Sequence, residues 1–373
     1  MSMAKKKKRK HKKQKDIVFF IQCGAFLLCV LSVFLAYKVL FHSFSLSDLS
    51  FKKTPKLLQQ ISGVQSMEQE QKDNSEVCEF RHVTTGVCGS GEEDVTEPLV
   101  AVIVENHKDA QPLSGIVQAD IVYEAPAEGG IPRFLAFFRE NTLVEKVGPV
   151  RSARPYFLDW LGEYGTPLFF HVGGSPESLR RIAQEGVRDM DEFSRSWYFW
   201  RSTKRHAPHN TYTSGKLWKG AGEKYGNGSV SSKKRWTFET LPVCEHDCVT
   251  MIDVDYFYKH EWWYESEENR YLRNQFRRPH VDENGEQISA STVIVQYVDA
   301  RVIDSVGRLA IGTSGSGAAL VFQGGRVTEG VWKKDETNGI TEWFDDYGEH
   351  IPLHQGNIWI EIVSRTDGKV VYK

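Results

Sequence analysis

Short runs of apolar residues separated by turn residues occupy the middle of the chain. Four of them have the length and the β-branched and aromatic content of buried strands: 99–106 (LVAVIVEN), 119–126 (ADIVYEAP), 132–140 (PRFLAFFRE) and 166–174 (TPLFFHVGG). Phe157, Leu158 and Leu161 fall on one side of a predicted helix over 151–164. Ser175 followed by Pro176 is a typical start for a second helix, which runs to about Gly186. Strands alternating with helices predict a mixed α/β domain over residues 96–230.

A loop rich in Gly, Ser and Lys at 222–235 ends this alternation. Beyond it, the segments 292–303, 318–327 and 358–363 carry alternating or continuous β-forming residues. Gly pairs, Asn284-Gly285 and Asn338-Gly339 supply turns between strands. The expected fold class is therefore an α+β or mixed α/β N-terminal domain followed by a β-rich domain over residues 236–365, preceded by one transmembrane helix.

The longest apolar run lies near the start of the chain. From Ile17 to Tyr37 there are 21 residues without a charged side chain, and about 20 helical residues span a bilayer. We predict a transmembrane helix over 17–41. Because the basic tail 1–16 precedes it, the positive-inside rule places the N-terminus in the cytoplasm and the rest of the chain outside.

Two other leader types fit this run less well. A cleaved signal peptide has a shorter apolar stretch and a cleavage site between small residues, which the end of this run lacks. A lipid-modified cysteine needs a small residue before it, but Cys23 follows Gln22 and Cys29 follows Leu28. We therefore favour a retained helix, with the lipid bilayer as a partner.

The formal net charge of −2 conceals an uneven distribution. Residues 1–15 carry nine Lys or Arg and no acid, which leaves 47 − 9 = 38 basic and 49 acidic residues, or −11, for the remainder. Beside a spanning helix, contact with anionic lipid explains the basic tail better than a nuclear-localisation or nucleic-acid patch does. The acidic body does not favour nucleic acid as a partner, although it leaves room for a local basic pocket.

Four cysteines lie outside the predicted helix. Residues 42–95 have the polar composition of a stalk, and Cys78 and Cys88 lie near its end. An even number of cysteines in a non-reducing compartment indicates disulfides, and Cys78–Cys88 with Cys244–Cys248 is the simplest of three connectivities. Cys244, His246 and Cys248 could instead bind zinc, but no second ligand pair of suitable spacing follows. We predict disulfides, with no metal and no cofactor.

The segment from Gly148 to Pro155 (GPVRSARP) is the densest group of residues suited to chemistry. At a strand-to-helix turn, free backbone N–H groups and the helix dipole favour anions, and Arg151 and Arg154 add forked cationic donors for phosphate or carboxylate. The alternative is that both arginines form ion pairs with Glu124 or Glu128 and serve only the fold.

A second turn of the same kind runs from His171 to Pro176 (HVGGSP). Gly173 and Gly174 allow close approach of backbone to an anion, although an ordinary tight turn capped by Ser175 explains the pattern equally well. His171, at the end of the predicted strand, is a general base or a hydrogen-bonded framework residue.

Two further groups of polar residues remain. Arg201, Arg205, His206, His209 and Asn210 share a predicted loop, where they could orient a ligand or supply an acid or base. Asp120, Glu124 and Glu128 are spaced by four, which puts them on one face of a strand; they could bind a cation, act as acid–base pairs or neutralise the arginines. The sequence has no G-x-S-x-G, P-loop, H-E-x-x-H or dinucleotide-binding motif, and Gly312–Gly317 is predicted to form a hairpin.

These groups together carry a resemblance to a known family. The segments 105–138 (ENHKDAQPLSGIVQADIVYEAPAEGGIPRFLAFF), 148–160 (GPVRSARPYFLDW), 171–179 (HVGGSPESL) and 207–213 (APHNTYT) resemble the YerB-like lipoproteins of bacteria, and Tyr271–Arg273, Pro279–Asp282, Gly315–Gly317 and Gly330–Trp332 resemble the C-terminal domain of that family. The resemblance covers about residues 96–365. It implies a two-domain protein at the bacterial cell envelope without implying a chemistry. Typical members look lipid-anchored, whereas this chain has the predicted helix.

The resemblance and the residue patterns together define the candidate site residues. Candidate acid–base residues are Asp120, Glu124, Glu128, His171 and His209, and candidate ligand-binding residues are Asn106, His107, Arg133, Arg151, Ser152, Arg154, Gly173, Gly174, Ser175, Arg201 and Asn210. The first hypothesis for the function is binding of an anionic envelope polymer or lipid. The second is hydrolysis or phosphoryl transfer on envelope material. The third is a scaffold that binds a partner through the β-rich domain, with residues such as Trp262 and Trp263 as anchors.

Overall fold

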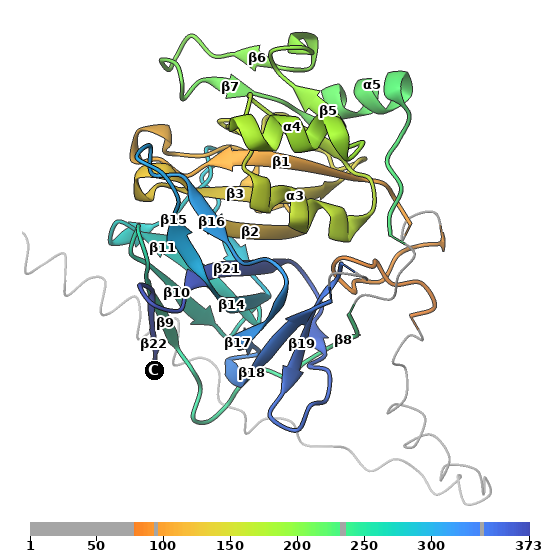
Figure 1. Ribbon diagram of the computed structural model, residues 1–373. Coiled ribbons are helices and arrows are strands. Elements are labelled where there is room, and N and C mark those ends of the chain that lie inside the picture. The colour runs from red at the N-terminus through yellow and green to blue at the C-terminus, as the bar shows by residue number, and fades with distance from the viewer. Residues whose placement is uncertain (1–77, 93–95, 232–235, 336–338) are drawn as a thin grey trace, which may run out of the picture. The chain divides into compact units, whose positions relative to one another are not determined.

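The computed structural model describes residues 78–92, 96–231, 236–335 and 339–373 (Figure 1). The predicted basic tail, the predicted transmembrane helix and most of the predicted stalk fall in residues 1–77 and lie outside this part. Among the described residues, none of the helices has the length and apolar character needed to cross a membrane.

A ten-stranded sheet, in the order β19-β18-β17-β14-β21-β2-β3-β1-β4-β5, organises the described chain. Its strands are β1 (Leu99–Glu105), β2 (Ile121–Pro126), β3 (Pro132–Arg139), β4 (Leu168–His171), β5 (Arg188–Asp191), β14 (Thr292–Val298), β17 (Gly315–Gln323), β18 (Arg326–Lys334), β19 (Thr341–Asp345) and β21 (Ile358–Ser364). Each half of the chain contributes five strands. The halves meet where β2 and β21 pair in parallel, from Ile121 opposite Ile358 to Glu124 opposite Glu361.

The remaining strands come mainly from the C-terminal part. A second sheet, in the order β12-β11-β10-β9-β22 with β13 beside β11, contains β9 (Met251–Asp255), β10 (His260–Glu265), β11 (Arg270–Gln275), β12 (Arg278–Pro279), β13 (Ser289–Ala290) and β22 (Lys369–Tyr372). Three small pairs are β6 (Trp200–Arg201) with β7 (Thr211–Tyr212), β8 (Phe238–Glu239) with β20 (Leu353–His354), and β15 (Ala300–Val302) with β16 (Leu309–Ile311). The predicted β-rich character of this part is confirmed.

All three described α-helices belong to the N-terminal part, which confirms its mixed α/β character. They are α3 (Pro155–Leu161), α4 (Pro176–Gln184) and α5 (Gly215–Tyr225), and the short 3-10 turns are η1 (Lys108–Ala110), η2 (Ile116–Gln118), η3 (Glu128–Gly130), η4 (Gly162–Tyr164) and η5 (Ser196–Tyr198). Helix α4 begins as predicted, because the Ser175 hydroxyl accepts the backbone N–H of Ser178. Helix α3 begins four residues later than predicted, because Pro155 forces Arg154 into an extended conformation.

The central strands are predominantly apolar because both faces of the large sheet are covered. On one face, Leu99, Ala101 and Ile103 of β1 pack with Phe157 and Trp160 of α3, and Figure 1 shows α3 and α4 lying across β1, β2 and β3. On the other face, Val100, Val102 and Val104 share a core with residues of the second sheet. A strand buried on both faces has a continuous apolar sequence, as in 99–104.

Two sequence predictions in the C-terminal part need correction. The predicted strand over 292–303 is interrupted at Asp299, so that β14 stays in the large sheet and β15 joins β16. The glycine-rich segment 312–317 is not a hairpin, because Gly315 and Gly317 lie within β17. A Cβ at Gly317 would lie 2.6 Å from both the Trp332 ring and the Tyr297 carbonyl oxygen, so glycine is needed there for packing. The Gly pair within the predicted strand segment 318–327, Gly324-Gly325, forms a turn between β17 and β18, with both residues at positive φ.

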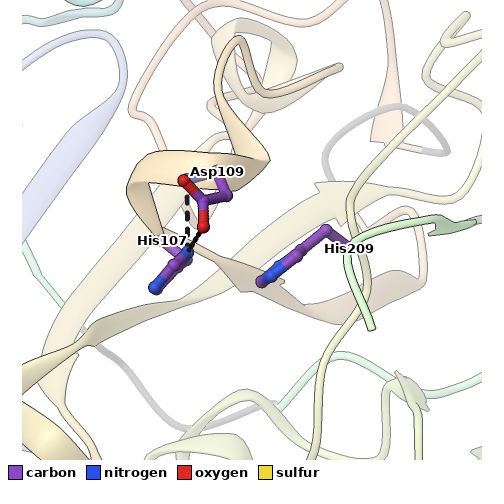
Figure 2. A group of neighbouring side chains, drawn as sticks. All are labelled: His107, Asp109 and His209. Carbon is purple, nitrogen blue, oxygen red and sulfur yellow. Dashed lines mark hydrogen bonds and ion pairs between the residues drawn. The ribbon is translucent and has the colours of Figure 1, made fainter. Parts of the chain in front are cut away.

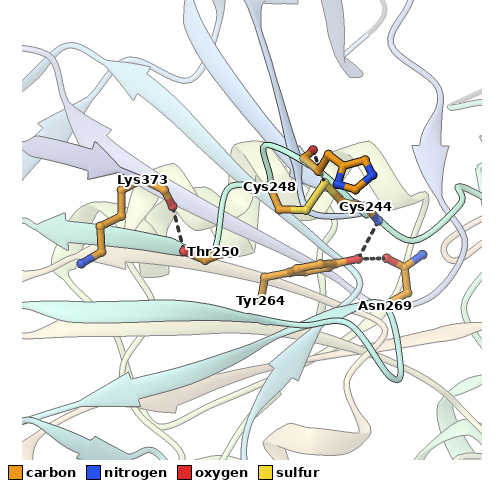
Figure 3. The surroundings of a disulfide bond; sticks show 7 residues. Cys244, Cys248, Thr250, Tyr264, Asn269 and Lys373 are labelled. Carbon is orange, nitrogen blue, oxygen red and sulfur yellow. Dashed lines mark hydrogen bonds between the residues drawn. A yellow bond between two sulfur atoms is a disulfide. The ribbon is translucent and has the colours of Figure 1, made fainter.

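Both predicted disulfides are present, Cys78–Cys88 and Cys244–Cys248. Figure 3 shows how the second one is attached to the fold: the Tyr264 hydroxyl accepts the backbone N–H of Cys244 at 3.4 Å and donates to Asn269 at 2.7 Å. Because the two sulfur atoms are bonded to each other, Cys244 and Cys248 are not available as zinc ligands.

Candidate functional site

Strands β1, β2, β4 and β5 run in the same direction, so their carboxyl ends meet at one edge of the large sheet. Ligands of open α/β sheets bind outside such an edge. Side chains from the loops at this edge, from the start of β3 and from the chain before α3 make ion pairs or ring contacts there, and we call them the carboxyl-edge cluster: Glu105, His107, Asp109, Glu128, Arg133, Arg151, Arg154 and His209.

Glu128 neutralises two arginines of the carboxyl-edge cluster. Arg154 donates from Nε and Nη2 to both Glu128 carboxylate oxygens, at 2.6 and 2.5 Å, and Arg133 Nη2 lies 3.5 Å from the same carboxylate. Burial and the nearby Arg154 guanidinium lower the pKa of Arg133 to about 10. Arg133 is also held by the Ser152 carbonyl oxygen at 2.8 Å. The alternative expected from the sequence, an ion pair between Arg154 and Glu128, is therefore present.

Glu105 links the other half of the carboxyl-edge cluster. One carboxylate oxygen lies 3.1 Å from Arg151 Nε and the other accepts from His209 Nδ1 at 2.8 Å. Figure 2 shows the His107 and His209 rings lying side by side, with Asp109 above His107. The two ring centroids are 4.9 Å apart and the planes differ by 12°. Both histidines are half-buried at this edge.

The second predicted anion-binding turn and the loop that carries Arg201 are both occupied by the protein's own carboxylates. Arg201 makes a two-pronged ion pair with Glu192, at 3.1 and 3.0 Å, and donates to Asn210 Oδ1 at 3.3 Å. The backbone N–H of Gly173 donates to Asp191 at 2.7 Å. In the same turn a Cβ at Gly174 would lie 2.5 Å from Ser178 Oγ, so the two glycines serve packing there.

His171 belongs to the framework of the fold rather than to the surface. Its ring is fully buried, with Nδ1 2.8 Å from the Gly173 carbonyl oxygen and Nε2 2.8 Å from Asp189 Oδ1. These contacts hold the turn after β4 against β5. The structure therefore places His171 beneath the edge, apart from the half-exposed histidines of the carboxyl-edge cluster.

The three carboxylates spaced by four do not meet. Asp120 pairs with Arg139 at 3.2 Å and accepts from Thr84, Glu124 pairs with Arg273, and Glu128 pairs with Arg154. Four residues along a strand span about 13 Å, which is too far for a shared cation. Burial raises the pKa of Asp120, although Arg139 opposes the shift. Each carboxylate thus serves a separate ion pair.

A buried polar network joins the two halves of the chain beneath the β2–β21 pair, and we call it the junction network. Arg273 of β11, fully buried, donates from Nη2 to both Glu124 oxygens at 3.0 and 2.8 Å and from Nη1 to Gln275 at 2.6 Å. Asn106 donates to both Glu124 and Gln275. Trp359 Nε1, from β21, donates to Glu124 Oε2 at 3.2 Å. Asn106 and Glu124, both candidate site residues, are therefore structural here.

Two histidines of the junction network have pKa values that are shifted in opposite directions. Both nitrogens of His260 face acceptors, the Tyr258 carbonyl oxygen and Glu361, each at 2.8 Å. Burial and Arg273 oppose protonation, but Glu361 and Glu124 outweigh them and raise the pKa of His260. His280 Nδ1 instead faces the Arg273 Nη1 donor at 2.5 Å, and burial together with Arg273 lowers its pKa well below the usual value. The surroundings thus favour the charged form of His260 and the neutral form of His280.

A cavity of about 300 Å³ opens beside the junction network. Its lining combines polar side chains of the N-terminal loop after β1 with the β11–β12 hairpin of the C-terminal part: Gln111, Pro112, Gln275, Phe276, Arg278, Pro279, His280 and Val281. Cavities at the boundary between two structural parts are common ligand sites. We refer to this space as the junction cavity.

Comparison with known proteins places this architecture in a family. The models described as "Protein of unknown function (DUF3048)" match residues 84–227 with the N-terminal domain and 252–360 with the C-terminal domain. The Bacillus subtilis (strain 168) protein described as "Putative lipoprotein YerB" is 34% identical over 291 residues, which cover 76% of this chain and 86% of the relative. The chain belongs to the YerB-like family. The crystal structure of the B. subtilis YerB protein superposes with a TM-score of 0.69 at 30% identity, over 78% of this chain and 99% of that one.

The predicted resemblance to the YerB-like family is therefore confirmed, and the structure adds residues that the motifs did not single out. Glu105 was part of a predicted strand, yet it connects Arg151 to His209. The motifs did not identify Arg273 and Gln275 as a polar pair. Together with Tyr271, at a spacing of two residues, they form the buried face of β11. A charged residue at an inward-facing position of a strand is the signal that points to such a buried network.

Proposed function

We propose that this YerB-like protein is a membrane-anchored, extracytoplasmic binding protein whose ligand is an anionic cell-envelope molecule, such as a phosphate-bearing polymer or lipid. The observation that carries the proposal is the junction cavity, because it combines one exposed arginine, Arg278, with the polar side chains of Gln111 and Gln275 in a largely apolar lining. Arg278 is exposed at this cavity, and within the described part of the chain no carboxylate lies within ion-pair distance of it.

The arginines of the carboxyl-edge cluster are weaker candidates for the ligand contact. Arg133 and Arg154 share Glu128, and Arg151 has Glu105. An external anion would have to displace a carboxylate from a hydrogen-bonded pair before it could bind. Arg278 needs no such exchange, so it provides the lower-cost contact for phosphate.

The hairpin that carries Arg278 supports the same proposal. Phe276 and Arg277 both have positive φ, 55° and 61°, a conformation that costs non-glycine residues about 1–2 kcal/mol each. Positive φ at both positions is what the two-residue hairpin turn between Gln275 and Arg278 requires. This turn leaves Phe276 41% exposed at the cavity, where its ring offers a flat apolar surface next to the cation.

Arg278→Gln tests the ligand contact. Poly(glycerol phosphate) added to the full chain in detergent should bind, and the affinity should fall about 10–100-fold in the variant, because a hydrogen bond to a charged group contributes about 1.5–3 kcal/mol. Isothermal titration calorimetry measures the change. The matched control is Arg326→Gln, which removes an exposed arginine outside the cavity lining. An equal loss in both variants, or equal binding of neutral dextran, would refute the proposal.

The anchoring part of the proposal rests on the uncharged run 17–37 behind the basic tail and on the printed name of the B. subtilis relative, "Putative lipoprotein YerB". In protoplasts, added protease should remove a tag placed after Lys373. The protein should also stay with the membrane through alkaline carbonate extraction and leave it only with detergent. A protected tag would contradict the orientation, and release by carbonate would contradict the spanning helix.

A further inference from the structure

We infer that His107, Asp109 and His209 form a binding site for one divalent transition-metal ion, of which Zn²⁺ is the type case. One ligand atom from each of the three side chains lies within 4.8 Å of the other two. Figure 2 shows the three side chains gathered at the carboxyl end of β1, with the two imidazoles facing each other. The site is separate from the junction cavity and does not depend on the proposed ligand.

Glu105 prepares His209 for a metal. Its carboxylate accepts the Nδ1 hydrogen of His209 at 2.8 Å, which leaves the lone pair on Nε2. Metal-binding histidines almost always donate their other nitrogen to a carboxylate or carbonyl in this way. Glu105 is itself only 3% exposed and is held by Arg151, so it fixes both the tautomer and the orientation of the ring.

His107 and Asp109 supply two further ligands at suitable separation. His107 Nδ1 accepts the backbone N–H of Asp109 at 3.2 Å, so this nitrogen carries no proton, and it lies 3.6 Å from Asp109 Oδ2. Two ligand atoms about 2.1 Å from a tetrahedral metal are about 3.4 Å apart, so this separation suits a metal once the Nδ1 lone pair is released from the Asp109 N–H. Asp109 is exposed and free to move toward the ion.

The two rings must change their relative orientation when the ion binds. They are nearly parallel, so the lone pairs of the two imidazoles lie in separate planes rather than converging. His107 is the ring that turns, because a single 3.2 Å hydrogen bond holds its Nδ1, whereas Glu105 holds His209 at 2.8 Å. Loss of the ring stack is therefore part of the inference.

The donor set selects the type of metal. Two imidazoles and one carboxylate suit Zn²⁺, Co²⁺ or Ni²⁺, whereas Mg²⁺ and Ca²⁺ prefer oxygen ligands alone. Three protein ligands leave a fourth position for water or an anion. A second group of similar composition, Glu124, His260 and Glu361, is less suitable because it is fully buried, with His260 and Trp262 both donating to Glu361.

Metal titration of the metal-free full chain in detergent tests the site. Calorimetry should detect one high-affinity Zn²⁺ per chain, and Co²⁺ should develop the visible absorption of a low-coordinate site. His107→Gln and His209→Gln should each abolish this binding, and Asp109→Asn should weaken it. Glu105→Gln should weaken it about 10–100-fold, as loss of an orienting carboxylate does. His350→Gln, which changes a histidine with 58% side-chain exposure, is the control and should bind as the unmodified chain does.

Circular dichroism shows whether each variant is folded. If the buried substitution Glu105→Gln prevents folding, the partly exposed His107→Gln still tests the site. Absence of a stoichiometric site, or unchanged binding in the His107→Gln/His209→Gln double variant, would overturn the inference. So would an equal loss in His350→Gln, since that would indicate scattered binding to surface histidines.

Discussion

Replacing Arg273 with methionine is expected to lower the free energy of unfolding by about 3–5 kcal/mol, the usual result of removing one partner of a buried ion pair. Arg273 is fully buried, and Glu124, 4% exposed, depends on it for two hydrogen bonds. Without Arg273, Glu124 would be left with Asn106 and Trp359 as its donors. The carboxyl would then take up a proton more readily, so the loss should be larger at pH 8 than at pH 5.

Denaturant unfolding followed by tryptophan fluorescence measures this loss. The matched control is Arg270→Met, on the same strand, whose arginine is 34% exposed and pairs with the exposed Glu268. Surface pairs contribute about 0–1 kcal/mol, so the control should unfold nearly as the unmodified chain does. Adding Glu124→Gln to Arg273→Met should recover part of the loss. If Arg273→Met matched Arg270→Met, the junction network would not have the stabilising role given to it here.

Stability should also pass through a maximum near pH 6.5, because the two histidines of the junction network titrate on opposite sides of it. The pKa of His280 is lowered, so below 6.5 the unfolded chain binds a proton that the folded chain does not, and stability falls on acidification. The pKa of His260 is raised, so above 6.5 the folded chain keeps a proton that the unfolded chain has lost, and stability falls as pH rises. Each histidine contributes a slope of up to about 1.4 kcal/mol per pH unit.

Unfolding free energies from pH 5 to 8 in His280→Gln and His260→Gln separate the two contributions. His280→Gln should remove the acid-side slope only, because glutamine can still accept from Arg273. His260→Gln should remove the alkaline-side slope only, in addition to a loss at all pH values from the unpaired Glu361. An acid-side slope that persists in His280→Gln would show that other groups cause it.

The strands and caps of this protein follow from local sequence, but the way they are joined does not. The apolar run 99–104 and the Ser175-Pro176 pair specify a strand and a helix start through interactions within a few residues. The pairing of β2 with β21 joins residues that are more than 200 positions apart in the sequence. The local sequence of neither strand indicates which strand it will pair with. The sequence therefore led to two separate domains, whereas the strands of both form one sheet.

The candidate site was predictable to the same extent. The carboxyl ends of β1, β2 and β4 bring several predicted residues to one edge, because parallel strands align these ends. Which carboxylate neutralises which arginine could not be derived, since the sequence offers both Glu124 and Glu128 as partners for Arg154. Glu124 instead pairs with Arg273, which lies beyond the predicted domain boundary.

The parallel contact between β2 and β21 also has a consequence for the order of folding. Until residues 358–364 are available, β2 has no partner on the side away from β3, and its backbone amides and carbonyls there are exposed. An unpaired edge of this kind is a site of aggregation, and contacts between distant segments form slowly. The N-terminal part is thus dependent on residues 358–364, so a nascent molecule remains vulnerable until that segment has been synthesised.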